Sequence, residues 1–518
     1  MRITEASFKR RFSVNHYKNL ILPMGEMSFY KNWPEAGRRG DPYPVIAKRG
    51  GVSERVGGGK YELSLGDGAV RRLVGAYFPW ANYDVSFDSL CGSVGFSVLG
   101  GEGAVEICLT NDGNLSVFLN GEEQKFKAPA VSCGKLSVWF RGEGVTVYLT
   151  ADEEETCLCD LAHPVLMRYC RVEALESAKV VLVVSGSGKT VISDLKWYLT
   201  AGISQADLRP IKYEDGTPIV EGGRVFLTAS ARCAVGKYQV VLSWCPTTAD
   251  FRLEGGIFFE YSDGYLCGDV ASSVIYDRRT GEWKIDMCSF SHGHVLGHGS
   301  SLSDPRFGIN TVEIELMPEA PETPETEEAS KGEASELANA ELAENPNAKA
   351  ECTESTDDDA RARFFAFERD EDPDSIYYNG RWYMAICRST DEGYRYYHFV
   401  SEDDGESYRF LARTDGAEKT GGSYVKCDDG VYFVCGSDFN KRSIYDVYSL
   451  DNLQSPISHL EPDFDDGGFR GWGSVMLLPY GSKLRYTWIT FDRHLGSHYN
   501  WSYGNIYVFD SEGFSKKR

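Results

Sequence analysis

Residues 371–389 read EDPDSIYYNGRWYMAICRS, and this stretch decides the fold. An alternating apolar segment runs into a turn at Asn379-Gly380 and then into a second aromatic segment, which is the pattern of a β-hairpin. Two carboxylates, Glu371 and Asp372, and a proline stand immediately before the first segment. Acidic residues and proline at such a place either end a loop or carry chemistry, so the stretch bears on function as well as on fold.

The same strand, glycine turn and aromatic strand occur in four other places. The copies are IVEGGRVFLTAS, YDRRTGEWKIDMCS, KCDDGVYFVCGS and LPYGSKLRYTWIT, and the five turn glycines are Gly223, Gly281, Gly380, Gly430 and Gly481. Their intervals are 58, 99, 50 and 51 residues, and the long interval shortens to 56 when the acidic stretch 318–360 is set aside. Antiparallel units that repeat at roughly 40–50 residues are typical of β-propellers. The sequence therefore predicts an all-β protein with a five-bladed propeller over residues 201–518.

The rest of the chain divides into three parts. Residues 65–200 contain short alternating strands separated by turn signals, which predicts a two-sheet, jelly-roll-like β-sandwich. Residues 1–64 include stretches rich in glycine and proline, and we interpret them as an extended or loop segment. Residues 318–360 carry 14 acidic residues and two lysines with few aromatic ones, so we expect a disordered insertion in the propeller.

Composition limits the partners and the compartment. The net charge of −23 and the pI near 4.9 argue against nucleic acid and against an anionic membrane surface. No apolar run approaches the ~20 residues of a membrane span. Fourteen cysteines without regular spacing indicate reduced thiols, and the N-terminus lacks an apolar leader, so we expect a cytoplasmic protein.

Acids before the turn glycines are the first candidates for chemistry. Asp207, Asp269 and Asp372 each precede the turn glycine of their repeat, and the first strand of a blade lines the central channel of a propeller. We therefore expect these three carboxylates to converge. In SFSHGHVLGHG, His292 and His294 are two residues apart and could meet a metal or a substrate hydroxyl. Because no recognisable ligand set is completed there, we expect channel-facing histidines and no metal.

Two further motifs have structural interpretations. SEDDGESYRF, residues 401–410, fits the Asp-box pattern of sialidases and other propellers, in which the side chains bond the backbone of a hairpin tip. SGSGKT, residues 185–190, is only half of a phosphate loop and is followed by a strand pattern, so we interpret it as a turn.

A family resemblance rests on two stretches. EDPDSIYYNGRWYMAI resembles the Asp-Pro strand of the five-bladed propeller glycoside hydrolases of families 43 and 32, and ADLRPIKYEDGTPIVEGGRVFLTAS resembles their opening blade. The sandwich is similar to concanavalin-like modules. The resemblance implies that Asp207 is the base or nucleophile and that Asp372 orients the substrate and tunes the pKa of the acid. It implies a general acid on the fourth blade, for which Glu418 stands about three residues early, with Glu371 and Glu260 as alternatives.

Hydrolysis of a small glycoside or oligosaccharide by carboxylate acid/base catalysis, without a cofactor, is therefore the expected function. Residues that could stack on a sugar or bond its hydroxyls are Asp269, Arg209, His292, His294, Trp244, Trp472 and Tyr424. A non-catalytic propeller that binds a glycan or a protein is the alternative, favoured by the missing fourth-blade Glu-Gly pair. EDPD also resembles the Glu-Asp-Pro-Arg strand of the family 130 phosphorylases, but Asp374 replaces the phosphate-binding arginine. A carbohydrate partner and a homo-oligomer formed through the sandwich are expected.

Overall fold

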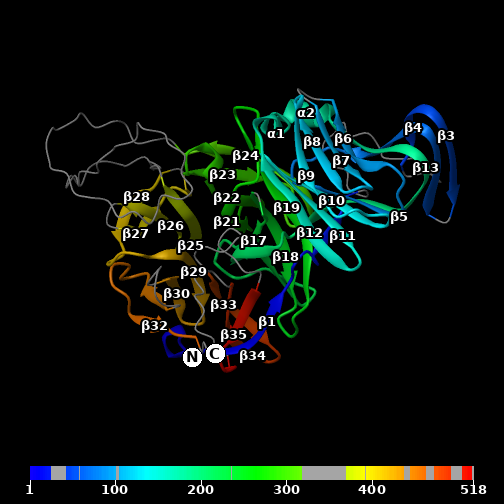
Figure 1. The fold of residues 1–518 in the computed structure, drawn as a ribbon. Helices are drawn as coiled ribbons and strands as arrows, with labels where there is room; N and C mark the ends of the chain where they lie inside the picture. The colour runs from blue at the N-terminus through cyan, green and yellow to red at the C-terminus, as the bar shows by residue number, and fades with distance from the viewer. Residues whose placement is uncertain are drawn as a thin grey trace, which may run out of the picture.

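The computed structural model describes residues 1–518 except 25–42, 58, 101–103, 235, 318–368, 391–392, 406, 437–443, 463–471, 492–504 and 516–518. β-Strands dominate the described residues, and the prediction of an all-β protein with a sandwich and a propeller is confirmed (Figure 1). The acidic insertion expected at 318–360 lies outside these residues. Among the described helices, none is long and apolar enough to cross a membrane.

The sandwich is built from strands β2 to β13. These are β2 Ile21–Pro23, β3 Val45–Gly57, β4 Lys60–Ala76, β5 Asn82–Ser89, β6 Ser93–Leu99, β7 Val105–Thr110, β8 Asn114–Leu119, β9 Glu122–Lys127, β10 Gly134–Arg141, β11 Gly144–Ala151, β12 Glu154–Ala162 and β13 Lys179–Thr200. The main pairing order is β12-β11-β10-β5-β13-β6-β7-β8-β9. Burial alternates strictly along β7 and β8, as expected of strands with one face on a core.

Two short helices, α1 Pro164–Arg168 and α2 Val172–Ser177, connect β12 to β13. The 22-residue β13 pairs with β4, β5 and β6 along its length and ends at Thr200, four residues before the propeller strand β14 begins. In Figure 1 the β3–β4 hairpin and the middle of β13 form the end of the sandwich farthest from the propeller.

The propeller strands form antiparallel groups of four, and one parallel strand pair joins the first two groups into a continuous sheet. The first two groups are β14 Ser204–Pro210, β17 Arg224–Arg232, β18 Lys237–Trp244 and β19 Phe251–Tyr261, followed by β21 Val270–Asp277, β22 Glu282–Ser289, β23 Val295–Ser301 and β24 Gly308–Leu316. The next two are β25 Asp370–Tyr378, β26 Arg381–Thr390, β27 Gly393–Ser401 and β28 Arg409–Arg413, then β29 Thr420–Cys427, β30 Gly430–Gly436, β31 Tyr445–Ser449 and β32 Ser458–Leu460. The last is β33 Ser474–Tyr480, β34 Lys483–Phe491, β35 Asn505–Asp510 and β1 Lys9–Asn15.

The innermost strands of these groups contact one another in ring order, from β14 through β21, β25, β29 and β33 back to β14. The short strands β15 Lys212–Tyr213, β16 Val220–Glu221 and β20 Leu266–Cys267 pair at the margins of the first two groups, and the 3-10 turns are η1 Ile3–Glu5 and η2 Phe290–His292. The ring places one end of every innermost strand around a common axis, where side chains distant in sequence meet.

Residues 1–64 supply strands to both parts of the fold, which corrects their interpretation as a separate extended or loop segment, and β1 belongs to the propeller. β1 pairs with β35 and forms the outermost strand of the last sheet, so the two ends of the chain close one sheet (Figure 1). The alternation in KRRFSVN explains the strand, because Phe12 and Val14 pack inward while the intervening polar residues face outward. β2, β3 and the start of β4 also lie within residues 1–64.

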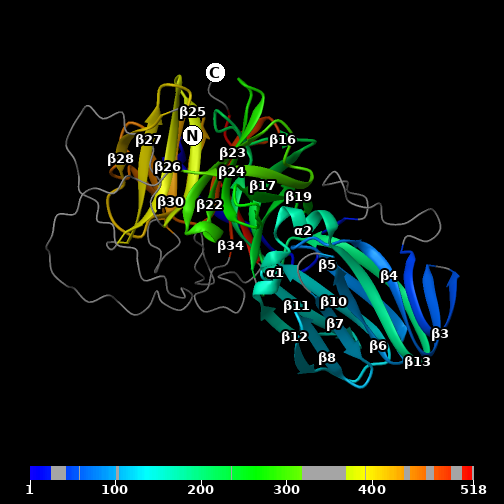
Figure 2. The ribbon, with the colours of Figure 1, turned by 90° about the horizontal axis from the view of Figure 1, so that it is seen from above.

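The sandwich packs against the first propeller sheet, and Figures 1 and 2 both show the two parts side by side. Phe78 and Trp80 place their rings 4.8 and 4.7 Å from the ring of Phe258 in β19. The buried Arg141 donates to Asn82 Oδ1 at 2.6 Å and its Nε lies 2.9 Å from Cys233 Sγ. One hydrophobic cluster therefore runs from the sandwich into the first sheet without interruption.

Candidate active site

The innermost strands share an irregularity at equivalent positions. In β14, β21, β25 and β29 the pairing with the next strand shifts register, and one residue of each bulge has a left-handed backbone. These residues are Asp207 (φ 51°), Ala271 (φ 59°), Asp372 (φ 52°) and Gly421 (φ 61°), and Trp472 (φ 55°) stands just before β33. A β-bulge changes the direction in which a side chain points. The five residues therefore mark equivalent positions, one on or just before each innermost strand, around the axis. Pro373 fits directly after Asp372 because a bulge releases its neighbour from the ladder.

Asp207 and Asp372 occupy two of these five positions and interact electrostatically, as expected from the sequence. Asp269 does not hold one of the five positions, because Ala271 is the left-handed bulge residue of β21. The buried Asp269 carboxylate instead accepts hydrogen bonds from the Tyr261 hydroxyl at 2.7 Å and from the Ser291 backbone at 3.0 Å.

Asp207 is held by β17. Its Oδ2 accepts from Ser230 Oγ at 2.6 Å and lies 3.1 Å from Arg232 Nη2, and the residue is 7% exposed. Ser230 and Arg232 are two apart, so they share a face of the strand. The sequence did not reveal these partners, because the pairing of Ala206 with Ser230 that aligns them is set by the register of β14 on β17. One oxygen of Asp207 therefore has a hydroxyl donor and a cationic partner, and charge-assisted contacts of this kind hold a carboxylate in place.

Asp372 lies in a different environment. Its Oδ1 is 2.9 Å from Arg209 Nη2, in an ion pair that lacks good hydrogen-bond alignment, and its Oδ2 accepts from the Gly421 backbone at 3.1 Å. Burial raises the pKa of Asp372 to about 7, the Arg209 cation opposes this rise, and the nearby charges of Glu371 and Asp207 add to it. A carboxyl with this pKa exchanges its proton near neutral pH.

A buried ion pair fixes the strand that carries Asp372. Lys212 Nζ lies 2.7 Å from both carboxylate oxygens of Asp374, and the side chains of both residues are 3% exposed. Asp374 also accepts from Ser273 Oγ at 2.9 Å and from the Tyr424 backbone at 2.7 Å. Its carboxylate therefore joins four propeller strands, β15, β21, β25 and β29, directly behind the candidate site.

The acid expected on the fourth blade is not where the resemblance placed it. Gly421 occupies the bulge position of β29, and a Cβ there would overlap the Cα of Trp472, so no side chain fits without moving Trp472. Glu418 stands three residues earlier, and its carboxylate lies against Gly393 in the β26–β27 turn. Glu418 therefore does not occupy the bulge position of β29. Glu260 lies in β19, the fourth strand of the first group and not one of the innermost strands.

The two histidines diverge, which corrects the expectation of one shared face. The chain turns through η2 and a left-handed Gly293 instead of remaining extended. His292 Nε2 lies 3.0 Å from Asp263 Oδ2, and its ring rests 3.9 Å from that of Tyr261. His294 points to the site, with its Nε2 3.2 Å from Oε2 of Glu371, the residue before Asp372.

Of the three aromatic candidates, only Trp472 reaches the central ring of positions. Its Nε1 donates to Thr420 Oγ1 at 2.8 Å. Trp244 is fully buried and stacks on Phe251, so its placement at the site was wrong. Tyr424 is also buried and its hydroxyl bonds to His398 Nδ1 at 3.0 Å, so it is a packing residue.

Two groups of side chains have the chemistry of metal ligands. The ligand atoms of Cys267, Asp269 and His292 lie within 4.8 Å of one another, as do those of Glu371, Asp372 and Cys387. One carboxylate of each group already has protein partners: Asp269 accepts from Tyr261 and Ser291, and Asp372 pairs with Arg209.

The Asp-box behaves as expected. Ser401 Oγ donates to Asp403 Oδ1 at 2.7 Å, Gly405 N donates to Ser401 Oγ at 2.8 Å, and Ser407 N donates to Asp403 Oδ1 at 3.0 Å. Hydrogen bonds, first that from Ser407, lower the pKa of Asp403 to about 2. The motif stabilises the turn between β27 and β28 and takes no part in the candidate site.

Comparisons with known proteins give only distant similarities. No protein-family model matches the chain, and no curated protein matches it in sequence. A solved structure of a thermostable family-43 glycoside hydrolase is 13% identical with a TM-score of 0.34, over 61% of this chain and 96% of that one. An endo-1,4-beta-xylanase from Bacteroides thetaiotaomicron is 12% identical with a TM-score of 0.33, over 60% and 90%. The carbohydrate binding module CBM66 from Bacillus subtilis is 11% identical with a TM-score of 0.22, over 30% and 94%.

Proposed function

We propose that the protein hydrolyses a glycosidic bond at the axial site formed by Asp207 and Asp372. The observation that carries the proposal is that two carboxyls at equivalent bulges of different sheets interact but have different partners. Glycoside hydrolysis needs one carboxyl that can give a proton and one that stays ionised near the reacting carbon. Unequal environments for two acids supply that division of roles.

The roles follow from the contacts. Asp207, which accepts from Ser230 and Arg232, is the base or nucleophile. Asp372, with its pKa raised to about 7 chiefly by burial, holds the proton that the leaving oxygen requires. This assignment replaces the fourth-blade acid, because Gly421 leaves no room for one. Glu371, held by His294, is the neighbouring carboxylate whose charge helps to keep the proton on Asp372.

A second candidate function is carbohydrate binding without catalysis, and the specific observation that favours it is Gly421. A ring that carries a glycine where the resemblance implies a glutamate has lost one of three implied carboxylates. Such a site could retain hydroxyl partners without turnover.

Turnover assays separate the two functions. We expect wild-type protein to release nitrophenol from at least one aryl glycoside in a panel of pentosides and hexosides, including α-arabinofuranoside and β-xyloside. Asp207→Asn and Asp372→Asn should each lower kcat by at least about 100-fold, on the usual scale of acid/base catalysis. The Asp403→Asn variant, altered in the remote Asp-box, is the control and should keep full activity.

The outcomes are distinct. Saturable sugar binding by wild-type protein with no turnover on any substrate would support the binding function and refute hydrolysis. Turnover that depends on added inorganic phosphate would indicate a phosphorylase instead. Equal activity in wild type and both variants would place the chemistry elsewhere.

A further inference from the structure

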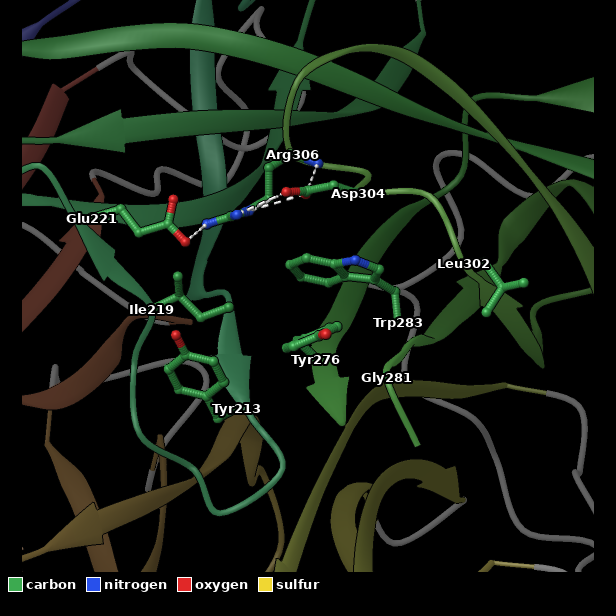
Figure 3. A pocket seen from close by; sticks show the side chains of 9 residues that line it. All are labelled: Tyr213, Ile219, Glu221, Tyr276, Gly281, Trp283, Leu302, Asp304 and Arg306. Atoms are coloured by element: carbon green, nitrogen blue, oxygen red, sulfur yellow. Dashed lines mark hydrogen bonds and ion pairs between the residues drawn. The ribbon is translucent and has the colours of Figure 1, made fainter. Parts of the chain in front are cut away.

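A cavity of about 320 Å³ opens at a separate place, between the first two propeller sheets. Its lining includes three aromatic residues, Tyr213, Tyr276 and Trp283, and three charged ones, Glu221, Asp304 and Arg306. Figure 3 shows Arg306 extended between Asp304 and Glu221 on one side, with the rings of Trp283 and Tyr276 beneath it. Cavities of this size are at the lower end of the range that holds small-molecule ligands.

This cavity lies at the opposite ends of the strands from the candidate active site. β15 and β21 pair in parallel, with Tyr213 opposite Tyr276. Tyr276 comes five residues after Ala271, the bulge residue of β21, and five strand residues span about 16 Å. Neither Asp207 nor Asp372 lines the cavity. A ligand here would be independent of the axial carboxylates.

The aromatic side of the cavity is supported from behind. Trp283 is 5% exposed and belongs to the hydrophobic cluster between the two sheets, and the ring of Tyr276 lies 4.9 Å from it. Tyr213 and Tyr276 are only partly buried, and the Arg278 guanidinium lies over the Tyr213 ring, 4.4 Å from its centre. Rings held in this way offer an apolar surface whose position costs little conformational entropy on binding.

The polar side is preorganised as well. Arg306 is 8% exposed at its side chain and is fixed between Asp304 Oδ2 at 2.7 Å and Glu221 Oε1 at 2.8 Å. The half-exposed Glu221 and the partly exposed Asp304 present carboxylate oxygens to the cavity mouth. The two acids and one arginine carry a net charge of −1, which disfavours an anion, and both carboxylates already have Arg306 as their cationic partner. A neutral ligand rich in hydroxyl groups satisfies both conditions, because it donates to carboxylates and stacks on rings.

We propose that this cavity binds a neutral sugar ring, as a second carbohydrate site on the propeller. The sugar ring lies against Tyr276 and Tyr213, and its hydroxyls donate to Glu221 and Asp304. The site does not rest on the proposed hydrolysis, because it shares no residue with the axial acids.

Isothermal titration calorimetry tests the site with xylobiose, cellobiose, maltose, lactose and methyl β-xyloside, each titrated into the full chain. The titrated protein carries Asp207→Asn and Asp372→Asn, so that axial chemistry cannot consume the probe. At least one sugar should give a saturable isotherm in the millimolar range or tighter. Glu221→Gln should weaken it at least tenfold, and Leu302→Trp, at an 82% exposed position of the cavity lining, should abolish it by filling the mouth.

Matched controls distinguish local from general effects. Glu402→Gln changes another exposed, ion-paired glutamate on the third sheet, and Ile457→Trp adds the same bulk at an exposed position of the fourth. Both should leave the affinity unchanged. A failure of every sugar to saturate, or binding that Leu302→Trp and Glu221→Gln leave intact, would overturn the proposal. If the cavity bound tetramethylammonium saturably and bound none of the sugars, the site would be a cation site and the sugar proposal would be wrong.

Discussion

The proton affinity of Asp372 can be tested without any substrate, through the pH dependence of stability. The pKa of this carboxyl is about 7 in the folded protein and 3.8 in the reference state that represents the unfolded chain. The folded state therefore holds the proton more tightly, so the contribution of Asp372 to stability is greatest at low pH and is lost as pH rises through 7. Proton linkage with these two pKa values predicts that Asp372 contributes about 2.5 kcal/mol less to the free energy of unfolding at pH 8 than at pH 5.

Asp372→Asn removes the titration and preserves the shape of the side chain. We expect the free energy of unfolding of wild type, minus that of the variant, to fall by about 2.5 kcal/mol from pH 5 to pH 8. Urea unfolding followed by tryptophan fluorescence at constant ionic strength measures it at each pH. Asp403→Asn is the control, because the pKa of Asp403 is about 2 and its carboxylate stays ionised throughout, so its difference should be flat.

The opposite result has a definite meaning. If the difference for Asp372 is constant or grows in favour of wild type as pH rises, the Arg209 ion pair outweighs burial and the carboxyl is ionised in the folded protein. Asp372 could then not hold the proton for a leaving group. The catalytic assignment of this residue would be refuted even if the fold and the ring of bulges stood.

Three other changes test the fold around the site. Lys212→Met should lower the free energy of unfolding by about 3–5 kcal/mol in urea, because it leaves the 3% exposed Asp374 carboxylate without its cation. The double variant Lys212→Met, Asp374→Leu should recover part of that stability. A loss under about 1 kcal/mol for Lys212→Met would contradict the importance of this ion pair. Gly421→Ala should lower stability by more than Gly281→Ala, since both glycines have positive φ but only Gly421 is crowded, by Trp472; equal effects would refute the crowding. Deleting residues 1–15 should remove hydrogen-exchange protection from the β35 amides that face β1, while those bonded to β34 stay protected. Unchanged protection of the first set would show that β1 is dispensable.

Local patterns explain which parts of the fold the sequence could predict. Alternating burial in the strands and the turn glycines Gly281, Gly380 and Gly430 depend on neighbours within a few residues. From these local features the sequence predicted an all-β protein and the spacing of its repeats. The strand at Lys9–Asn15 was missed because its partner, β35, is about 500 residues away, and nothing in the segment itself reveals that pairing.

The candidate site was predictable only in part, for a related reason. Asp207 and Asp372 were found because each precedes a hairpin in a repeat, whereas Asp269 lies two residues before the bulge residue of β21, which is Ala271. A two-residue difference in the position of a bulge leaves the composition and the alternation of the strand unchanged, so neither reveals it. The partners Ser230 and Arg232 depend likewise on the register across β14 and β17 and therefore required the structure.

Backbone strain at the ring does not by itself mark the chemistry. Non-glycine residues with positive φ cost about 1–3 kcal/mol each and often occur at functional sites. Here Ala271 and Trp472 adopt the same left-handed conformation as Asp207 and Asp372, although neither carries an ionisable group. The strain is thus a property of how each innermost strand meets the axis, and it recurs whatever side chain is present. Both acids are 7% exposed, so what distinguishes them is their contacts: Ser230 and Arg232 for Asp207, and Arg209 with the Gly421 backbone for Asp372. The functional assignment depends on those contacts.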